Sequence, residues 1–329
     1  MAGASETSPG DVNFSDLDHA VYLQFQNVFM FYLPRLCEHC LNPACVASCP
    51  SGALYKRDED GIVLVDQERC RGWRYCVSGC PYKKVYFNWK TGRAEKCIFC
   101  YPRIESGQTT LCAHSCVGRI RYVGVVLYDA DRIAEAAATP GEQNIYQAHL
   151  DLLLDPHDSE IQKAAVADGI AANVMDAAIR SPIFKLAKAW HLALPLHPEY
   201  RTLPMVWYVP PLSPISALET DCNASDAVDR LRIPIKYLAN LLSAGDPKPV
   251  RLALKRLMAI RQFMRAARLD QGHDDQVLRR VDLSPETARE IYQLLALARY
   301  EDRFVLTTKG SATEDVYAMQ GCCGFPDTD

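Results

Sequence analysis

The stretch that decides the fold runs from Cys37 to Cys116 and holds three groups of closely spaced cysteines. The first group reads CEHCLNPACVASCP (37–50), the second reads CRGWRYCVSGCP (70–81) and the third reads CIFCYPRIESGQTTLCAHSC (97–116). Eleven of the 14 cysteines of the chain fall inside this stretch. Thiols this dense, at regular short spacings, indicate metal or cluster ligation, because thiolates are preferred ligands of zinc and of iron–sulfur clusters.

The first two groups follow the ligand pattern of a ferredoxin with two clusters. Both end in C-x3-C-P, and each has further cysteines at short intervals before that ending. In such proteins one cysteine run wraps three corners of a 4Fe-4S cluster, and the cysteine before the proline ligates the neighbouring cluster. The ligands that this crossing predicts for one 4Fe-4S cluster are Cys37, Cys40, Cys45 and Cys80.

The second predicted cluster lacks one ligand. Cys70 and Cys76 share it with Cys49 from the first group, but Trp73 stands where the middle cysteine of the run is expected. An indole ring does not bind iron, so a cluster held by three thiolates is expected to lack one iron corner. We therefore predict a 3Fe-4S cluster at Cys49, Cys70 and Cys76.

Disulfides and structural zinc are the alternative interpretations of these spacings. Disulfides are disfavoured because C-x2-C spacings suit metals better than bridges and because nothing in the sequence indicates secretion. Zinc also uses C-x2-C pairs, but it does not require two consecutive C-x3-C-P endings. The spacing therefore favours iron–sulfur clusters.

The third cysteine group has no matching group in this chain. Cys97, Cys100 and Cys112 are predicted to wrap three corners of a further 4Fe-4S cluster, and the crossing rule makes Cys116 an orphan ligand of another one. The structural alternative is a zinc ion held by these four thiolates. The remaining cysteines are isolated and poor substitutes for the missing ligands; they are Cys222, Cys322 and Cys323.

Histidines and basic residues accompany the cysteine groups. His39 and His114 lie between cysteines, and this position is more typical of loop histidines with hydrogen-bond partners than of iron ligands. The basic residues either neutralise anionic clusters in part and dock partner subunits, or form a solvated basic face. They are Arg71, Arg74, Lys83, Lys84, Arg119 and Arg121.

Four stretches carry a family resemblance. They read YLQFQNVFMFYLPRLCEHC (22–40), CRGWRYCVSGCPYKKVYFNWKTGRAEKCIFCYPRIESG (70–107), HPEYRTLPMVWYVPPLSP (197–214) and YEDRFV (300–305). These stretches resemble the beta subunit of the membrane-bound respiratory nitrate reductases, the ferredoxin-like electron-transfer subunit of a molybdenum enzyme. The resemblance covers most of the chain, and a tryptophan in place of one cysteine is a mark of that family.

The resemblance implies a subunit that carries electrons and has no substrate site of its own. Electrons would pass from a quinol-oxidising membrane cytochrome b (gamma) subunit, along the clusters, to a molybdenum-containing catalytic (alpha) subunit that reduces nitrate to nitrite in anaerobic respiration. In agreement, the sequence has no dinucleotide-binding glycine motif, no P-loop and no serine nucleophile elbow. The implied location is the cytoplasmic face of the cell membrane, peripheral and bound to the membrane subunit.

Two alternatives to this function stay open. Related complexes, such as nitrite oxidoreductase and the chlorate, perchlorate and selenate reductases, have similar beta subunits. The family also has a cysteine quartet near its N-terminus, which completes the ligands of the third group, and this sequence is expected to start after it. A truncated form with a structural, non-redox role is therefore the second alternative.

Composition and charge limit the kinds of partner. The chain of 329 residues is 49% hydrophobic and 23% charged, which is enough apolar content for a packed core. Its net charge of −4 argues against nucleic acid. No apolar run reaches the roughly 18 residues of a transmembrane helix, and the N-terminus shows no signal-peptide pattern. We expect a chain that is soluble by itself, stays in the cytoplasm and meets the membrane only through a partner.

The sequence predicts an α+β protein with three parts. Residues 1–18 are small and polar and are predicted to be disordered. Residues 19–130 are predicted to form a ferredoxin-like polycysteine domain, and residues 131–329 a mainly helical C-terminal domain. Prolines are dense at 195–214, where they resist both helix and central strand. Such a segment lies either along its own core or across a partner subunit, and the resemblance favours contact with a partner.

Local patterns predict the individual elements. β-branched and aromatic residues predict strands at 62–65, 85–89 and 120–128. Short helical turns are predicted to begin at the prolines that follow Cys49 and Cys80. Ser284, followed by proline and glutamate, predicts a helix start. The predicted helices cover 132–138, 159–179, 182–194, 227–245, 249–269 and 284–304.

Overall fold

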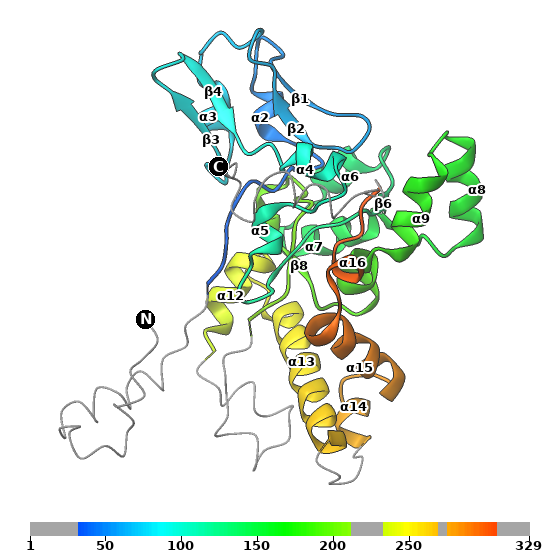
Figure 1. The fold of residues 1–329 in the computed structure, drawn as a ribbon. Helices are drawn as coiled ribbons and strands as arrows, with labels where there is room; N and C mark the ends of the chain where they lie inside the picture. The colour runs from blue at the N-terminus through cyan, green and yellow to red at the C-terminus, as the bar shows by residue number, and fades with distance from the viewer. Residues whose placement is uncertain (1–31, 212–232, 269–274, 308–329) are drawn as a thin grey trace, which may run out of the picture.

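The computed structural model describes residues 32–211, 233–268 and 275–307. Figure 1 shows two small hairpins with short helices at one end of the molecule and the longest helix at the other end, with the remaining elements packed between them. This mixture of helix and strand confirms the predicted α+β class. Several predicted residues lie outside the described part of the chain, namely residues 1–18, Cys222, Cys322 and Cys323.

The cysteine-rich end consists of two units of the same design. Each unit is a short helix followed by a two-stranded antiparallel hairpin. A small core that contains Cys45, Cys76 and Cys80 lies between the two units and packs them together. The first unit is α2 (Ala44–Ala47) with β1 (Leu54–Lys56) and β2 (Val63–Val65), and the second is α3 (Tyr75–Gly79) with β3 (Val85–Asn88) and β4 (Arg93–Lys96).

The short helices lie before the Cys-Pro endings, so the prediction of helical turns that begin at Pro50 and Pro81 is wrong. Both α2 and α3 end before the cysteine of their Cys-Pro pair. The ring of a proline clashes with the backbone of the preceding residue and pushes that residue out of the helical region. Cys80 is accordingly extended, with φ −78° and ψ 112°. The prolines therefore end these helices instead of starting new ones.

The three predicted strands have different outcomes. Those at 62–65 and 85–89 are confirmed as β2 and β3. The region 120–128 is not one strand, because the chain passes from one sheet to another within it. β5 (Arg121–Tyr122) joins the central sheet, whereas β6 (Leu127–Tyr128) pairs with β7 (Leu153–Leu154).

The central sheet has three strands and corrects the prediction for the proline-rich stretch. Its middle strand is β9 (Trp207–Tyr208), which pairs with β5 on one side and with β8 (Leu194–Pro195) on the other. A central strand forms here because the prolines of the sheet stand only at the edge, in β8, where no ladder donor is needed. The prediction that this stretch avoids a central strand is therefore wrong.

The described part of the proline-rich stretch packs on the chain's own core. Leu196, Leu203, Val206, Trp207 and Tyr208 are all buried within the chain. These five side chains belong to the core of the chain, whereas Tyr200 of the same stretch is exposed, so partner contact by this stretch stays a prediction. Residues 212–214 lie outside the described part.

The helical part follows the predictions with several changes. A single helix predicted at 159–179 is two helices, α8 (Ser159–Ala167) and α9 (Ala172–Arg180), because Gly169 between them takes a φ of +79°. No helix is predicted at α7 (Glu142–Asp151) or at α14 (Gln276–Arg279). The helix predicted at 284–304 is interrupted after the π-helical turn η3 (Gln293–Leu297), where Ala298 leaves the helical conformation, and the helix predicted at 182–194 ends before Leu194, which belongs to β8. The others are α6 (Ile133–Ala138), α10 (Pro182–Phe184), α12 (Ile235–Leu242), α13 (Pro247–Arg268), α15 (Pro285–Tyr292) and α16 (Tyr300–Arg303), with the π-helical turn η1 (Lys185–Ala189), the short helix α4 (Tyr101–Glu105), the short helix α5 (Leu111–His114) and the 3-10 turn η2 (Pro198–Tyr200).

One large core joins the central sheet to the C-terminal helices. It includes Tyr122 and Trp207 of the sheet, Leu254 and Ile260 of α13, and Ile291 of α15. The side-chain hydroxyl of Ser284 accepts a hydrogen bond from the Thr287 N–H at 3.1 Å, so the predicted helix start at α15 is confirmed. Among the described residues no helix is long and apolar enough to cross a membrane.

His149 on α7 is completely buried against β9. Its ring stacks on that of Trp207, with centroids 5.0 Å apart and an interplanar angle of 29°. Neither of its ring nitrogens has a hydrogen-bond partner among the described residues. Burial lowers the pKa of His149 from 6.5 to about 3, because an imidazolium would lose its hydration there. The folded chain therefore holds this side chain neutral.

Acidification should destabilise the fold through His149. The unfolded imidazole gains its proton near pH 6.5 and the folded one only near 3, so stability present above 6.5 is lost as the pH falls toward 3. The loss approaches about 1.4 kcal/mol for each pH unit. Urea-unfolding midpoints measured from about pH 7.5 to about pH 5 should fall less steeply for His149→Leu than for the wild type. The exposed His157→Leu is the control, and its profile should parallel the wild type. Equal slopes in all three proteins would show that His149 is not the titrating group.

Candidate iron–sulfur centres

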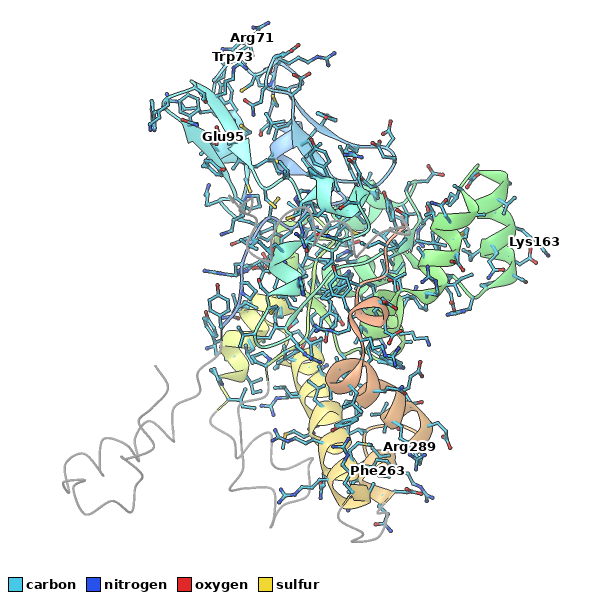
Figure 2. The ribbon with its side chains drawn as sticks, in the orientation of Figure 1. Arg71, Trp73, Glu95, Lys163, Phe263 and Arg289 are labelled. Carbon is cyan, nitrogen blue, oxygen red and sulfur yellow. The ribbon has the colours of Figure 1, made fainter. Side chains whose placement is uncertain are left out.

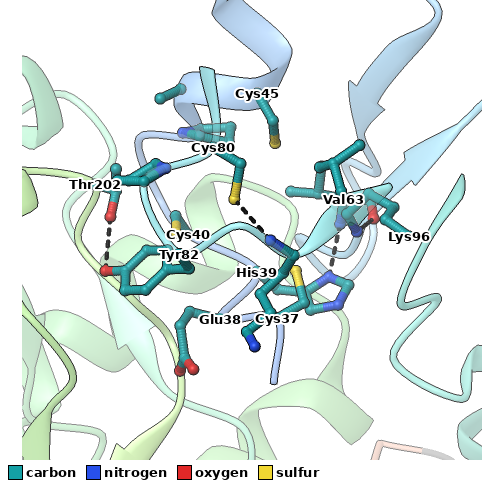
Figure 3. Close-up of a pocket in the computed structure, with 15 residues that line it drawn as sticks. Cys37, Glu38, His39, Cys40, Cys45, Val63, Cys80, Tyr82, Lys96 and Thr202 are labelled. Carbon is teal, nitrogen blue, oxygen red and sulfur yellow. Dashed lines mark hydrogen bonds between the residues drawn. The ribbon is translucent and has the colours of Figure 1, made fainter. Parts of the chain in front are cut away.

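Four cysteines from separate parts of the sequence line one cavity at the junction of the two helix–hairpin units. They are Cys37 and Cys40 from the loop before α2, Cys45 on α2, and Cys80 at the end of α3. Figure 3 shows their sulfur atoms around this cavity. All four are free thiols, and three of them are buried. The structure thus brings together the residues predicted to hold the first 4Fe-4S cluster.

The chemistry of this cavity suits a positively charged iron–sulfur core. Burial raises the pKa of Cys45 to about 12, and the nearby Cys37 and Cys80 thiols raise it further by repulsion. Burial also raises the pKa of Cys40 well above its ordinary value. Thiols with raised pKa values become thiolates only when a metal replaces their protons. Backbone support is present as well, since the Lys84 N–H points at the Cys80 sulfur at 3.4 Å.

The residues predicted for the second cluster also lie together. The neighbouring thiols of Cys49 and Cys70 contribute to the raised pKa of Cys76, after the larger effect of burial. The Cys70 sulfur accepts a hydrogen bond from the Ala94 N–H at 3.4 Å, and Cys49 lies 3.4 Å from the Ser51 hydroxyl. Both Cys49 and Cys70 are only partly buried. This group is therefore more open to solvent than the first.

Trp73 lies at the outer tip of the cysteine-rich end (Figure 2) and is 55% exposed. The preceding Gly72 takes a φ of +71°, and a Cβ there would lie 2.5 Å from the carbonyl oxygen of Gly92 in the β3–β4 turn. Only glycine suits both the backbone conformation and the close approach. This turn thus fixes the loop that carries Trp73 between Cys70 and Cys76.

The third cysteine group is gathered less completely. Cys97 is near Cys112. Burial raises the pKa of Cys97, the Phe99 N–H and the charge of Lys96 lower it, and the Cys112 thiol adds a smaller rise. Cys116 is buried in the large core instead, where its sulfur accepts a hydrogen bond from the Ile120 N–H at 3.3 Å. Within the described part of the chain, no group of three or more Cys, His, Asp or Glu side chains is arranged to hold a single metal ion. This holds for all three cysteine groups, so it does not decide between zinc and an iron–sulfur cluster at Cys97, Cys100, Cys112 and Cys116.

The loop histidines are placed differently. His39 is buried, its Nδ1 accepts a hydrogen bond from the Val63 N–H at 3.1 Å, and its ring packs on Phe99. Nδ1 is therefore occupied as an acceptor, and the remaining nitrogen carries the proton of the neutral ring. Burial lowers the pKa of His39 well below its ordinary value. His114 is exposed and contacts Tyr300 edge to face.

A buried ionic network fixes the loop that carries Cys37 and Cys40. The Arg121 guanidinium donates to the Cys37 carbonyl at 3.1 Å, to the Pro34 carbonyl at 3.4 Å and to the Tyr208 hydroxyl at 2.5 Å. The Tyr208 hydroxyl donates to the Glu38 carboxylate at 2.9 Å, and Glu38 lies 3.8 Å from Arg121. Burial raises the pKa of Glu38 to about 7, although the Arg121 charge opposes that rise. The network ties the cysteine loop to strands β5 and β9.

Comparison with known proteins assigns the family. Residues 28–126 match the model of a 4Fe-4S dicluster domain, and residues 212–285 match that of the respiratory nitrate reductase beta C-terminal region. The chain is 57% identical to respiratory nitrate reductase 2 beta chain of Escherichia coli over 99% of its own length and 65% of that protein. It is 52% identical to the nitrate reductase beta chain of Bacillus subtilis over 99% of itself and 68% of that protein. The chain belongs to the family of respiratory nitrate reductase beta chains.

A related beta subunit is less similar. The chlorate reductase subunit beta of Ideonella dechloratans is 42% identical over 68% of this chain and 52% of that protein. The match to nitrate reductase beta chains is thus both closer and more extensive. The chain spans about 65% of the length of the Escherichia coli relative.

The buried structural role of Arg121 in this beta chain is not evident from the sequence. In the sequence it is one of several basic residues near the cysteines, and its partners Glu38 and Tyr208 are 83 and 87 positions away. A weak signal exists, because Arg121 stands in an apolar stretch, IRYVGVV, where a charged side chain needs a buried partner. The pattern does not say which carboxylate that partner is.

Removing Arg121 should destabilise the fold strongly. Arg121→Met leaves the Glu38 carboxylate buried without its cation, which is expected to cost about 3–5 kcal/mol. Arg121→Met combined with Glu38→Gln should recover part of this loss, because the uncompensated charge is gone. Urea-unfolding midpoints and iron content of the purified proteins would measure both effects. The matched control is Arg132→Met, which removes an exposed ion pair and should change stability by less than about 1 kcal/mol. A loss in Arg121→Met no larger than in that control would contradict this role.

Proposed function

We propose that this chain is the iron–sulfur electron-transfer subunit of a respiratory nitrate reductase. The single observation that carries the proposal is the gathering of Cys37, Cys40, Cys45 and Cys80 around one cavity, in a chain of the nitrate reductase beta family. No substrate chemistry is proposed for the chain itself. Its role is to bind clusters at fixed positions and to bind partner subunits.

We propose the following ligands for the clusters. The first cavity holds a 4Fe-4S cluster, and Cys49, Cys70 and Cys76 hold a 3Fe-4S cluster beside Trp73. When bound, such clusters supply one-electron carriers. The protein supplies buried thiolates, N–H groups directed at sulfur, and protection from water at the first site. Cys97, Cys100 and Cys112 are proposed as three ligands of a further 4Fe-4S cluster and Cys116 as a ligand of another, each completed by cysteines outside this group.

The proposed partners follow from the family. The electrons come from a membrane cytochrome b subunit that oxidises quinol, and they go to a molybdenum-containing catalytic subunit that reduces nitrate to nitrite. The chain would then be peripheral, on the cytoplasmic face of the cell membrane and bound there through the membrane subunit. The relatives in Escherichia coli and Bacillus subtilis are named as nitrate reductase beta chains, which supports this assignment over a chlorate or selenate complex.

Low-temperature EPR of the anaerobically purified chain should test the ligand assignment. Oxidised protein is expected to show a 3Fe-4S signal, because the second site has three thiolates. Trp73→Cys supplies a fourth thiolate and should replace that signal by a four-iron species that is detected only after reduction, with a matching gain in iron. The ratio of iron to protein would be measured in parallel.

Trp89→Cys is the matched control for this experiment. Trp89 is 77% exposed, and its ring contacts that of Phe87 on the same hairpin edge to face. A cysteine there adds a thiol to the same hairpin without standing in the cysteine run, so the oxidised signal should persist. Zinc without iron in the wild-type protein would overturn the electron-transfer proposal and leave a structural module. Conversion by both variants would show that the fourth ligand position is not at residue 73.

A further inference from the structure

Lys96 is a buried lysine in the wall of the first cysteine cavity. It is the last residue of β4, it is only 6% exposed, and it lines the cavity together with Cys37, Cys40, Cys45 and Cys80. Its ammonium group donates to the Cys97 carbonyl at 2.8 Å and to the Val63 carbonyl. Figure 3 shows it beside Val63, across the cavity from Thr202. Hydrogen bonds to two neutral carbonyls orient the charge but do not neutralise it.

The charge of Lys96 has no carboxylate partner. Within residues 32–211, 233–268 and 275–307, no Asp or Glu side chain lies within ion-pair distance of its Nζ. The buried carboxylate nearest in sequence to the cavity cysteines, Glu38, is paired with Arg121 instead. A buried ammonium without a counter-charge is strongly unfavourable, because several kcal/mol of hydration are lost. A negatively charged group in the cavity would offset this cost.

Among the described residues, the groups near Lys96 that can carry a negative charge are cysteine thiols. Its positive charge favours the thiolate form of Cys37, Cys45 and Cys97 and so lowers their pKa values, against the larger effect of burial that raises them. Two of these residues belong to the first cavity and one to the third cysteine group. Lys96 thus lies between the two groups and acts on both.

Lys96 also helps to shape the first cysteine loop. Its ammonium holds the Val63 carbonyl, and the N–H of the same residue donates to Nδ1 of His39, which stands between Cys37 and Cys40. The chain of contacts from Lys96 through Val63 to His39 connects β4, β2 and the loop. A charge fixed in this way stays beside the cavity and is not free to move out to solvent.

We infer that Lys96 is the counter-cation of the cluster in this cavity and a positioning residue that raises its reduction potential. The inference rests on the proposed cluster at Cys37, Cys40, Cys45 and Cys80. The reduced form of a 4Fe-4S centre carries one more negative charge than the oxidised form, so a buried ammonium stabilises the reduced form more. Lys84, the other cation that lines the cavity, is only partly buried, and its charge is screened accordingly.

The test is a redox titration of the full chain, in its natural complex, followed by EPR with dithionite as reductant. Lys96→Gln keeps a donor for the two carbonyls but removes the charge, and Lys96→Arg keeps the charge. The glutamine variant should reduce at least tenfold less favourably at the first cluster, which is a shift of about 59 mV to more negative potential for one electron. The arginine variant should stay closer to the wild type than to Lys96→Gln.

Lys90→Gln is the matched control. Lys90 lies on the same hairpin and is exposed. Its substitution by glutamine removes the same formal charge from the chain as Lys96→Gln does. Its potential should equal that of the wild type. If Lys96→Gln shifts no more than Lys90→Gln, or if Lys96→Arg shifts as far as Lys96→Gln, the charge of Lys96 does not set the potential and the inference is wrong.

Loss of the cluster is also informative. If iron and the EPR signal are lost in Lys96→Gln but kept in Lys96→Arg, the charge is needed for the cluster to bind, which supports the counter-cation role. If both variants lose the cluster, the shape of the side chain matters and the charge does not, which overturns the inference. Wild-type protein without any iron signal would instead reject the proposed function itself, so the two failures are distinguishable.

Discussion

The placement of the cysteine-rich end depends on one buried guanidinium. Arg121 holds the carbonyl groups of Pro34 and Cys37, the hydroxyl of Tyr208 and the carboxylate of Glu38 at the same time. Its two terminal nitrogens are hydrogen-bonded in this way, whereas Nε has no hydrogen-bond partner among the described residues, so the nearby Glu38 carboxylate contributes to the compensation of this buried charge. These partners come from the first cysteine loop and from the middle strand of the central sheet. The loop that carries Cys37 is therefore fixed relative to the central sheet, and this fixes the position of the first cavity as well.

The two cysteine units are alike in backbone and different in surroundings. Both are a short helix followed by a hairpin, and in both a Cys-Pro pair follows the helix, with Cys80 of the second unit extended before its proline. The first cavity, however, is covered by the helical part through Tyr82, whose hydroxyl contacts Leu196 and Thr202. In the second group, Trp73 lies at the outer tip. Burial raises the pKa of Cys49, but hydrogen bonds from the Ser51 hydroxyl and nearby N–H groups together lower it below its ordinary value. Equivalent positions of one repeated unit thus provide a dry site and a wetter one.

Cysteine spacing predicted more of the site than of the fold. Short-range intervals and the crossing rule are enough to group Cys45 with Cys80 instead of Cys49, because a cluster demands particular chain geometry. Helix positions around the prolines were predicted wrongly, since the same Cys-Pro pair is compatible with a helix on either side. The middle strand at Trp207 was missed because proline density describes the segment as a whole, whereas pairing depends on the two residues that carry no proline. The burial of Arg121 and Lys96 could not be predicted from the sequence. A buried cation cannot be told from an exposed one until its partners, which are distant in the chain, are known.

Burial and charge act in opposite directions at the first cavity. A dry, apolar environment disfavours the more negative reduced form of a cluster and lowers its potential, whereas a fixed ammonium such as that of Lys96 favours the reduced form and raises it. At the second group the first of these effects is weaker, because water reaches Cys49 and Cys70, and a buried cation is needed less. Arg74, an exposed cation of this end, stacks on Phe87 and Trp89 at the surface. The potentials of the two proposed clusters can be set separately in this way, by a buried charge placed only where the protein has removed the solvent.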